Sequence, residues 1–181
     1  MSVDGFYAGP HGEIGWFKVR TNDDEFERYT LGQSQEGSTL VFGRATYEMM
    51  KSYWPTQDAR NSDPSMARIV NESPKIVFSK TLQDPQESPH WKNIRIFHEI
   101  QKEAILRLKK QEDRDFTILG SGTIIQQFAN LGLIDEYNLV MVPVVLGAGK
   151  ALFKDVKTMN LALLKERSFR NGIVLLTYRP D

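Results

Sequence analysis

The sequence contains no cysteine, which excludes disulfides, thiolate metal ligands and a cysteine nucleophile. Lys+Arg and Asp+Glu balance at 23 each, and a chain without net charge has no global field that attracts nucleic acid or an anionic membrane. No apolar run approaches the roughly 20 residues needed to span a bilayer. The N-terminus lacks the basic and apolar regions of a signal peptide. We therefore expect a cytoplasmic protein with no nucleic-acid or membrane partner.

Several catalytic motifs are also missing. The sequence has no nucleophile elbow, no P-loop and no paired histidine ligands. The histidines His11, His90 and His98 are scattered without metal-ligand spacing. Hydrolase, kinase and metalloenzyme functions lose support accordingly, and we assign no histidine a catalytic role and expect no metal.

The chain has 181 residues, of which 40% are hydrophobic and 25% charged, so we expect a single globular domain over residues 1–181. Short apolar runs bounded by turn residues predict buried strands, and amphipathic patterns between them predict helices. The expected strands are 39–42, 75–78, 94–97 and 116–119, and the expected helices are 23–31, 44–53, 64–71, 99–110 and 123–131. This alternation predicts right-handed crossovers and a mostly parallel sheet.

The C-terminal part has a different pattern. A strand is expected over 136–142, and two strands over 161–169 and 173–178 are joined through Asn171-Gly172, which is a strong hairpin signal. We therefore predict an α/β fold of three αβα layers, with a mixed, mostly parallel sheet and a C-terminal antiparallel hairpin at one edge. The polar, proline-rich segments 55–65 and 81–91 are expected to be surface loops.

Gly43 directly follows the first expected strand and precedes a helix. A glycine there lets a ligand approach the backbone, and the helix N-terminus offers free N–H groups that suit phosphate. Arg44 can bind a phosphate with two hydrogen bonds, and Thr46 can donate one from its hydroxyl. The same residues also fit a tight turn with Arg44 on the surface.

A second turn of this kind contains Gly120, Ser121, Gly122, Thr123 and Ile124, again between a strand and a helix. Alone it is a weak signal, because no third glycine completes the dinucleotide fingerprint. Two such turns in one chain carry more weight, since ligands of open α/β sheets bind at the carboxyl ends of the strands.

A third strand end carries Ser79 and Lys80, which suit a charged or phosphorylated group but also fit a polar strand end. Together with Arg44 and Thr46 they favour a 2′-phosphate, and therefore NADPH over NADH.

The N-terminal segment places Asp4 and Phe6 close to Trp16 in the sequence. A carboxylate beside aromatic side chains resembles the wall of a small-molecule site, although an Asp-Gly turn with core aromatics explains the same residues. Acids crowd the start of the expected helix 23–31, where they stabilise the helix dipole and one could face a cleft.

These motifs in their order resemble the dihydrofolate reductase-like superfamily, and within it the reductase domain of riboflavin biosynthesis and its stand-alone relatives. The resemblance rests on the segments 2–6, 43–48, 79–82, 120–122, 132–136, 143–149, 152–153 and 171–172. It implies an αβα fold around a mixed sheet, NADPH as hydride donor, and often a homodimer. It also implies that Gly43, Arg44 and Thr46 hold cofactor phosphates, that Ser79 and Lys80 lie near the 2′-phosphate, and that residues 120–124 cross the pyrophosphate.

By the same resemblance, Asp4 and the aromatic residues Phe6 and Trp16 flank the nicotinamide and the substrate. Dihydrofolate reductases have a proline in the tryptophan loop, which this chain lacks, and the register of their catalytic acid is open here among Asp23, Asp24 and Glu27. Asp4 and Asp24 are our candidate catalytic acids. We expect an NADPH-dependent reductase of a pyrimidine- or pterin-like molecule. The alternatives are a non-catalytic nucleotide-binding domain, a true dihydrofolate reductase, and a protein that only dimerises through its hairpin edge.

Overall fold

The computed structural model describes residues 1–17, 25, 26, 28, 29, 37–119 and 122–181. The chain divides into two compact units, one of residues 1–30 and 125–181 and the other of residues 31–124. The expected single domain over 1–181 stays a prediction. In the described part of the chain, no helix is long and apolar enough to cross a membrane.

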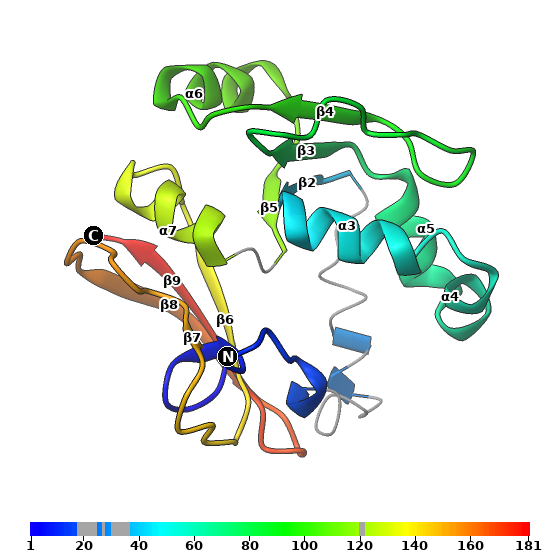
Figure 1. Ribbon diagram of the computed structural model, residues 1–181. Coiled ribbons are helices and arrows are strands. Elements are labelled where there is room, and N and C mark those ends of the chain that lie inside the picture. Colours follow the sequence, from blue (N-terminus) through cyan, green and yellow to red (C-terminus); the bar gives the residue numbers. More distant parts are fainter. Residues whose placement is uncertain (18–24, 27, 30–36, 120–121) are drawn as a thin grey trace. The chain divides into compact units, whose positions relative to one another are not determined.

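The unit of residues 31–124 is built on a four-stranded sheet in the order β4-β3-β2-β5 (Figure 1). Its strands are β2 (Thr39–Gly43), β3 (Lys75–Phe78), β4 (Ile94–Phe97) and β5 (Phe116–Ile118). All neighbouring pairs are parallel. These strands are the four apolar runs of the sequence, and the predicted α/β fold with a parallel sheet is confirmed.

Helices connect these strands. α3 (Arg44–Tyr53), α4 (Gln57–Ser62) and α5 (Pro64–Glu72) link β2 to β3, and α6 (Lys102–Gln111) links β4 to β5. The second connection runs back across the sheet, so right-handed crossovers place α6 on the face opposite α3 and α5. On the α3 side the core contains Phe42, Tyr47, Val77 and Trp91. Both faces of the central strands are therefore covered, which explains why β2 and β3 are mostly apolar and buried along their whole length.

The expectation that 55–65 is a surface loop was wrong, because α4 occupies most of it. The hydroxyl of Thr56 accepts a hydrogen bond from the Ala59 N–H at 3.2 Å and so caps α4. Asp63 caps α5 in the same way, and Pro64 takes the first helical turn. The composition suggested a loop, although these caps were visible in the sequence as helix-start signals.

The other unit contains an antiparallel sheet in the order β6-β9-β8, with β6 (Tyr137–Met141), β8 (Leu161–Ser168) and β9 (Val174–Pro180). β8 and β9 form the predicted C-terminal hairpin, and Gly172 in its turn has a φ of 86°. A second pair joins β1 (Phe6–Ala8) to β7 (Lys150–Ala151). The core of this unit includes Phe26, Phe169 and Ile173.

The last helix is α7 (Gly122–Asn130), close to the expected 123–131. From residue 125 onward it belongs to the unit with the antiparallel sheet. The expected helix 23–31 lies mostly outside the described residues.

Candidate nucleotide-binding site

The N-terminus of α3 lies at the carboxyl end of β2. Gly43 caps the helix with φ −85° and ψ 163°, an extended conformation that any residue can adopt. Among the described residues, no side chain caps this helix start with a hydrogen bond, and its first turn contains no acid. The free N–H groups and the positive end of the helix dipole therefore remain available to an anion.

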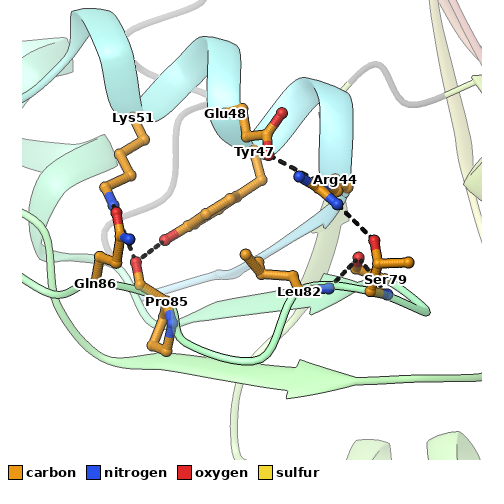
Figure 2. Close-up of polar contacts among 9 residues, drawn as sticks. Arg44, Tyr47, Glu48, Lys51, Ser79, Leu82, Pro85 and Gln86 are labelled. Carbon is orange, nitrogen blue, oxygen red and sulfur yellow. Dashed lines mark hydrogen bonds and ion pairs between the residues drawn. The ribbon is translucent and has the colours of Figure 1, made fainter.

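Arg44 is the first residue of this helix, with about half of its side chain exposed. Its Nε donates to Oε1 of Glu48 at 2.7 Å (Figure 2), and its Nη1 donates to the hydroxyl of Thr81. These two bonds hold the guanidinium between α3 and the segment that follows β3. Among the described residues its Nη2 has no hydrogen-bond partner, so the group keeps a donor for an anion at the helix N-terminus.

Ser79 and Lys80 follow the end of β3. The buried Ser79 hydroxyl accepts hydrogen bonds from the N–H groups of Thr81 at 3.3 Å and Leu82 at 3.0 Å. This closes a tight turn and leaves the hydroxyl hydrogen able to donate. Lys80 lies at this turn with an exposed side chain. Register pairs Gly43 with Phe78, so the turn begins beside the start of α3.

The segment after this turn is fixed to α3 by Tyr47 and Lys51. The Tyr47 hydroxyl donates to the Pro85 carbonyl at 2.6 Å, and Lys51 Nζ donates to the same oxygen at 3.1 Å (Figure 2). Trp91, which is fully buried, donates from Nε1 to the Tyr47 hydroxyl at 3.2 Å. Burial raises the pKa of Tyr47 above its ordinary value. These hydrogen bonds therefore fix α3 to the segment that follows the Ser79 turn, and the sequence motifs did not reveal them.

The structure describes some of the remaining residues that were predicted to bind the cofactor. Thr46 is half-buried in the first turn of α3. β5 pairs with β2, which brings the strand end before the second glycine turn beside the strand end before Gly43. Gly120 and Ser121 lie outside the described residues. In α7, Gly122 and Ile124 are buried and Thr123 is exposed. The structure thus brings together the strand ends that carry Gly43, Arg44, Ser79 and Lys80, and their cofactor role stays a prediction.

Asp4 belongs to the other compact unit. Its carboxylate accepts hydrogen bonds from the N–H groups of Leu146 at 3.1 Å and Gly147 at 2.7 Å. The side-chain hydrogen bond from Ser2, followed by these backbone bonds, lowers the pKa of Asp4 below its ordinary value. Asp4 is therefore a carboxylate near neutral pH, and it fixes the loop after β6.

Phe6 and Trp16 are both half-buried in the unit that contains Asp4. Phe6 lies in β1 and pairs with Ala151 of β7. Trp16 donates from Nε1 to the Glu13 carbonyl at 3.1 Å. Asp24 lies outside the described residues, so its catalytic role, like the substrate roles of Phe6 and Trp16, stays a prediction.

Sequence reasoning missed the partners of Asp4 because they lie 142 and 143 residues away in the chain, with no local signal to connect them. It also missed Thr81 and Glu48 as partners of Arg44. The spacing of Arg44 and Glu48, four residues apart on one helix face, was the available signal for an ion pair. Among the described residues, no group of three or more His, Asp or Glu side chains is placed to hold a metal ion.

Known proteins are similar to this chain over most of its length. The family model described as the RibD C-terminal domain matches residues 1–175. The uncharacterized protein YyaP of Bacillus subtilis is 33% identical over 179 residues, which is 98% of this chain and 90% of that protein. The crystal structure of a riboflavin biosynthesis protein, described as putative, from Shewanella sp. PV-4 superimposes with a TM-score of 0.77 at 24% identity, over 100% of this chain and 95% of that one.

A bifunctional deaminase and 5-amino-6-(5-phosphoribosylamino)uracil reductase from Thermotoga maritima has the same fold, with a TM-score of 0.67 at 17% identity. The superposition covers 99% of this chain and 54% of that protein. The predicted dihydrofolate reductase-like fold of the riboflavin-reductase type is therefore confirmed.

Proposed function

Because this chain belongs to the RibD C-terminal domain family, we propose that it is an NADPH-dependent reductase of the riboflavin-biosynthesis type, acting on a small pyrimidine- or pterin-like molecule. The observation that carries the proposal is the uncapped N-terminus of α3, with Arg44 at its first position and the Ser79 turn beside it. This arrangement suits a phosphorylated nucleotide at the carboxyl ends of parallel strands.

The residues present fit the cofactor by their chemistry. The N–H groups at the start of α3 would bind a diphosphate, and the free Nη2 of Arg44 would add a charged hydrogen bond. Ser79 and Lys80 supply a hydroxyl donor and an ammonium group, which suit a 2′-phosphate. NADPH, when bound, would supply the hydride. The chain's contribution is to bind and orient the nucleotide.

On the substrate side we propose that Asp4 acts as a hydrogen-bond acceptor. Its lowered pKa leaves it ionised near neutral pH, so it holds no proton to donate there. An anionic carboxylate would orient an N–H of a pyrimidine or pterin ring, and Phe6 and Trp16 would contact the flat face of such a ring. Asp24 and solvent water stay the candidates for a proton donor.

Nucleotide binding tests the proposal first. NADPH is titrated into the protein while its nicotinamide fluorescence is followed, for the wild type, for Arg44→Ala and for Arg107→Ala. Arg107 is an exposed arginine of α6 and serves as the control. We expect Arg44→Ala to weaken binding about tenfold or more, since a hydrogen bond to a charged group is worth about 1.5–3 kcal/mol. The proposal would be refuted if the wild type bound no NADPH at micromolar protein concentrations.

Turnover separates a reductase from a non-catalytic nucleotide-binding domain. Oxidation of NADPH is followed by its absorbance with riboflavin intermediates, folates and quinones as acceptors. A reductase of the proposed type oxidises NADPH with a pyrimidine acceptor, whereas dihydrofolate as the single acceptor would favour a dihydrofolate reductase. Binding of NADPH without turnover of any acceptor would favour the non-catalytic alternative.

We also propose that the protein is a homodimer, as the family resemblance implies. β8 supports this, because it is an edge strand of its sheet with Leu163 51% and Leu164 45% exposed. Light scattering should then give about twice the 20.7 kDa chain mass. A mass of one chain at micromolar concentrations would contradict the dimer.

A further inference from the structure

A cavity of about 300 Å³ lies at the amino ends of β3 and β4. The end of α5, directly before β3, forms one wall, and the segment before β4 forms another. Ser79 follows the opposite end of β3, about 13 Å from Lys75 at about 3.3 Å per strand residue. The cavity is therefore separate from the strand ends at which we propose nucleotide binding. Its volume is at the lower limit for small-molecule sites, so it suits a ligand smaller than a dinucleotide.

Basic side chains dominate the lining of this cavity. Arg60, Arg68 and Lys92 carry positive charges, and Glu72 is the single acid among the described residues that line it. His90 also lines the cavity and donates one N–H in its neutral form, so the excess of cations does not depend on its protonation. Cations gathered around a hollow attract an anion. Phosphate fits two arginines and a lysine, because a guanidinium binds its oxygens in pairs.

The cations at the two walls are held differently. Arg60 donates from Nη1 to the Pro55 carbonyl and from Nη2 to Oε1 of Gln57 at 2.9 Å. Its guanidinium is therefore oriented and keeps further N–H groups for a ligand. Lys92 is exposed, and within the described part of the chain its Nζ has no hydrogen-bond or ion-pair partner. Its ammonium group is thus available to an anion.

The buried Lys75 connects the two walls. Its Nζ donates to the Asn71 carbonyl of α5 at 2.9 Å and to the Lys92 carbonyl at 3.5 Å. The backbone N–H of Lys75 donates to the Asn93 carbonyl at 2.8 Å. These hydrogen bonds fix the end of α5 against the segment before β4, so the walls of the cavity are formed before a ligand binds.

Asn71 is an independent indication of a ligand. It lines the cavity and is 7% exposed. Its Nδ2 donates to the Trp54 carbonyl at 2.9 Å, and its backbone carbonyl accepts from Lys75. Its Oδ1 is buried and has no hydrogen-bond partner among the described residues. A buried acceptor without a donor is unfavourable, so a ligand hydroxyl that donates to Oδ1 gains affinity beyond the attraction of charges.

We propose that this cavity is a second binding site, for a small phosphate monoester that also carries a hydroxyl group. Arg60, Arg68 and Lys92 bind the phosphate, and Oδ1 of Asn71 accepts a hydrogen bond from the hydroxyl. The site lies at the sheet edge opposite the proposed nucleotide site and does not depend on the proposed function.

The test uses two phosphate monoesters that differ in their hydroxyl groups. Glycerol 3-phosphate has hydroxyls and methyl phosphate has none, and at pH 7.5 both are mostly dianions, because the second pKa of a phosphate ester is about 6. Each is titrated into the ¹⁵N-labelled full chain while backbone amide shifts are followed. We expect shifts at Glu72, Lys92 and Asn93, and a dissociation constant about tenfold lower for glycerol 3-phosphate, because its hydroxyl satisfies a buried acceptor.

Single substitutions of the cations test the phosphate contacts. Lys92→Gln and Arg68→Gln should each weaken both esters about fivefold or more, because each removes a charged hydrogen bond. Lys110→Gln and Arg107→Gln are the matched controls, which remove the same charges from α6 and should leave both dissociation constants unchanged. All four side chains are exposed, so the variants should keep the fold.

Several results would overturn the inference. Shifts confined to Gly43 and Lys80 would place both esters at the proposed nucleotide site and leave this cavity without a ligand. Equal dissociation constants for the two esters would show that Asn71 receives no hydroxyl. Equal weakening by the cavity variants and the α6 controls would show an unspecific effect of net charge. A failure to bind NADPH would refute the proposed function alone, because shifts at Lys92 with the expected preference would still support this second site.

Discussion

Lys75 offers the sharpest test of how this fold handles a buried charge. The side chain is fully buried at the start of β3, with Nζ 2.9 Å from the Asn71 carbonyl, 2.7 Å from the Ser73 carbonyl and 4.5 Å from the centre of the Trp91 ring. The two carbonyls end α5, where a cation is favourable. Burial nevertheless dominates and lowers the pKa of Lys75 from 10.5 to about 8. The perturbation is Lys75→Met, which keeps the apolar stem and removes the ammonium group.

Two contributions oppose each other at neutral pH. Each carbonyl that loses its donor costs about 1–3 kcal/mol. Removal of the buried cation returns about 3 kcal/mol, since a pKa unit is worth about 1.36 kcal/mol. They nearly cancel, so the informative quantity is the change of stability with pH.

The sign of that change follows from proton linkage. Between pH 8 and 10.5 the unfolded chain binds more protons at Lys75 than the folded chain, so folding becomes more favourable as pH rises. The penalty from this residue falls from about 3 kcal/mol at pH 7 to about 1 kcal/mol at pH 9.5. The wild type should therefore gain about 2 kcal/mol relative to Lys75→Met over this range.

The measurement is urea unfolding of the wild type, Lys75→Met and Lys154→Met at pH 7.0 and 9.5. Other groups that titrate in this range cancel in the difference between variants. Lys154 is exposed, so its variant should follow the wild type at both pH values. A difference between wild type and Lys75→Met that stays constant within about 0.5 kcal/mol would refute the reasoning. It would mean that the carbonyl hydrogen bonds compensate the burial of the ammonium group.

Three further predictions concern single contacts. Gly149→Ala should destabilise the protein by about 1–3 kcal/mol in urea unfolding, because its Cβ would lie 2.4 Å from the carbonyl oxygen of Ala8; Gly15→Ala, whose Cβ meets nothing within 4 Å, is the control and should change stability little. Tyr47→Phe should lower the free energy of unfolding by about 1–3 kcal/mol in thermal or urea unfolding, because the buried indole N–H of Trp91 loses its acceptor. An unchanged unfolding midpoint would contradict a stabilising role of this hydrogen bond. Asp4→Asn should lower kcat/KM for the reductase reaction while leaving the NADPH dissociation constant unchanged, and equal loss of both would argue against a substrate-side role.

The parallel sheet was predictable because its strands are covered on both faces. In the sequence such strands are short, mostly apolar runs, as 39–42 and 75–78 show. The juxtaposition of Gly43, Arg44, Ser79 and Lys80 followed from the same pattern, since parallel strands present their carboxyl ends at one edge. α4 was not predicted because a polar composition outweighed two capping signals. Lys75 was assigned to an apolar strand, and nothing in the sequence indicated that its ammonium group would donate hydrogen bonds to carbonyls at the end of a helix.

The environment of Asp4 depends on contacts that no local pattern contains. Asp4 was proposed from its neighbours in the sequence, yet its pKa is set by Ser2 and by N–H groups at Leu146 and Gly147. A carboxylate held in this way remains ionised as pH falls toward its ordinary pKa, and it loses this stabilisation only on further acidification. As an acceptor it fixes the loop after β6, and in the proposed reductase it would orient a ring N–H. A proton required by that proposed reduction would then come from another acid or from water, which makes Asp24 the more important candidate of the two for proton transfer.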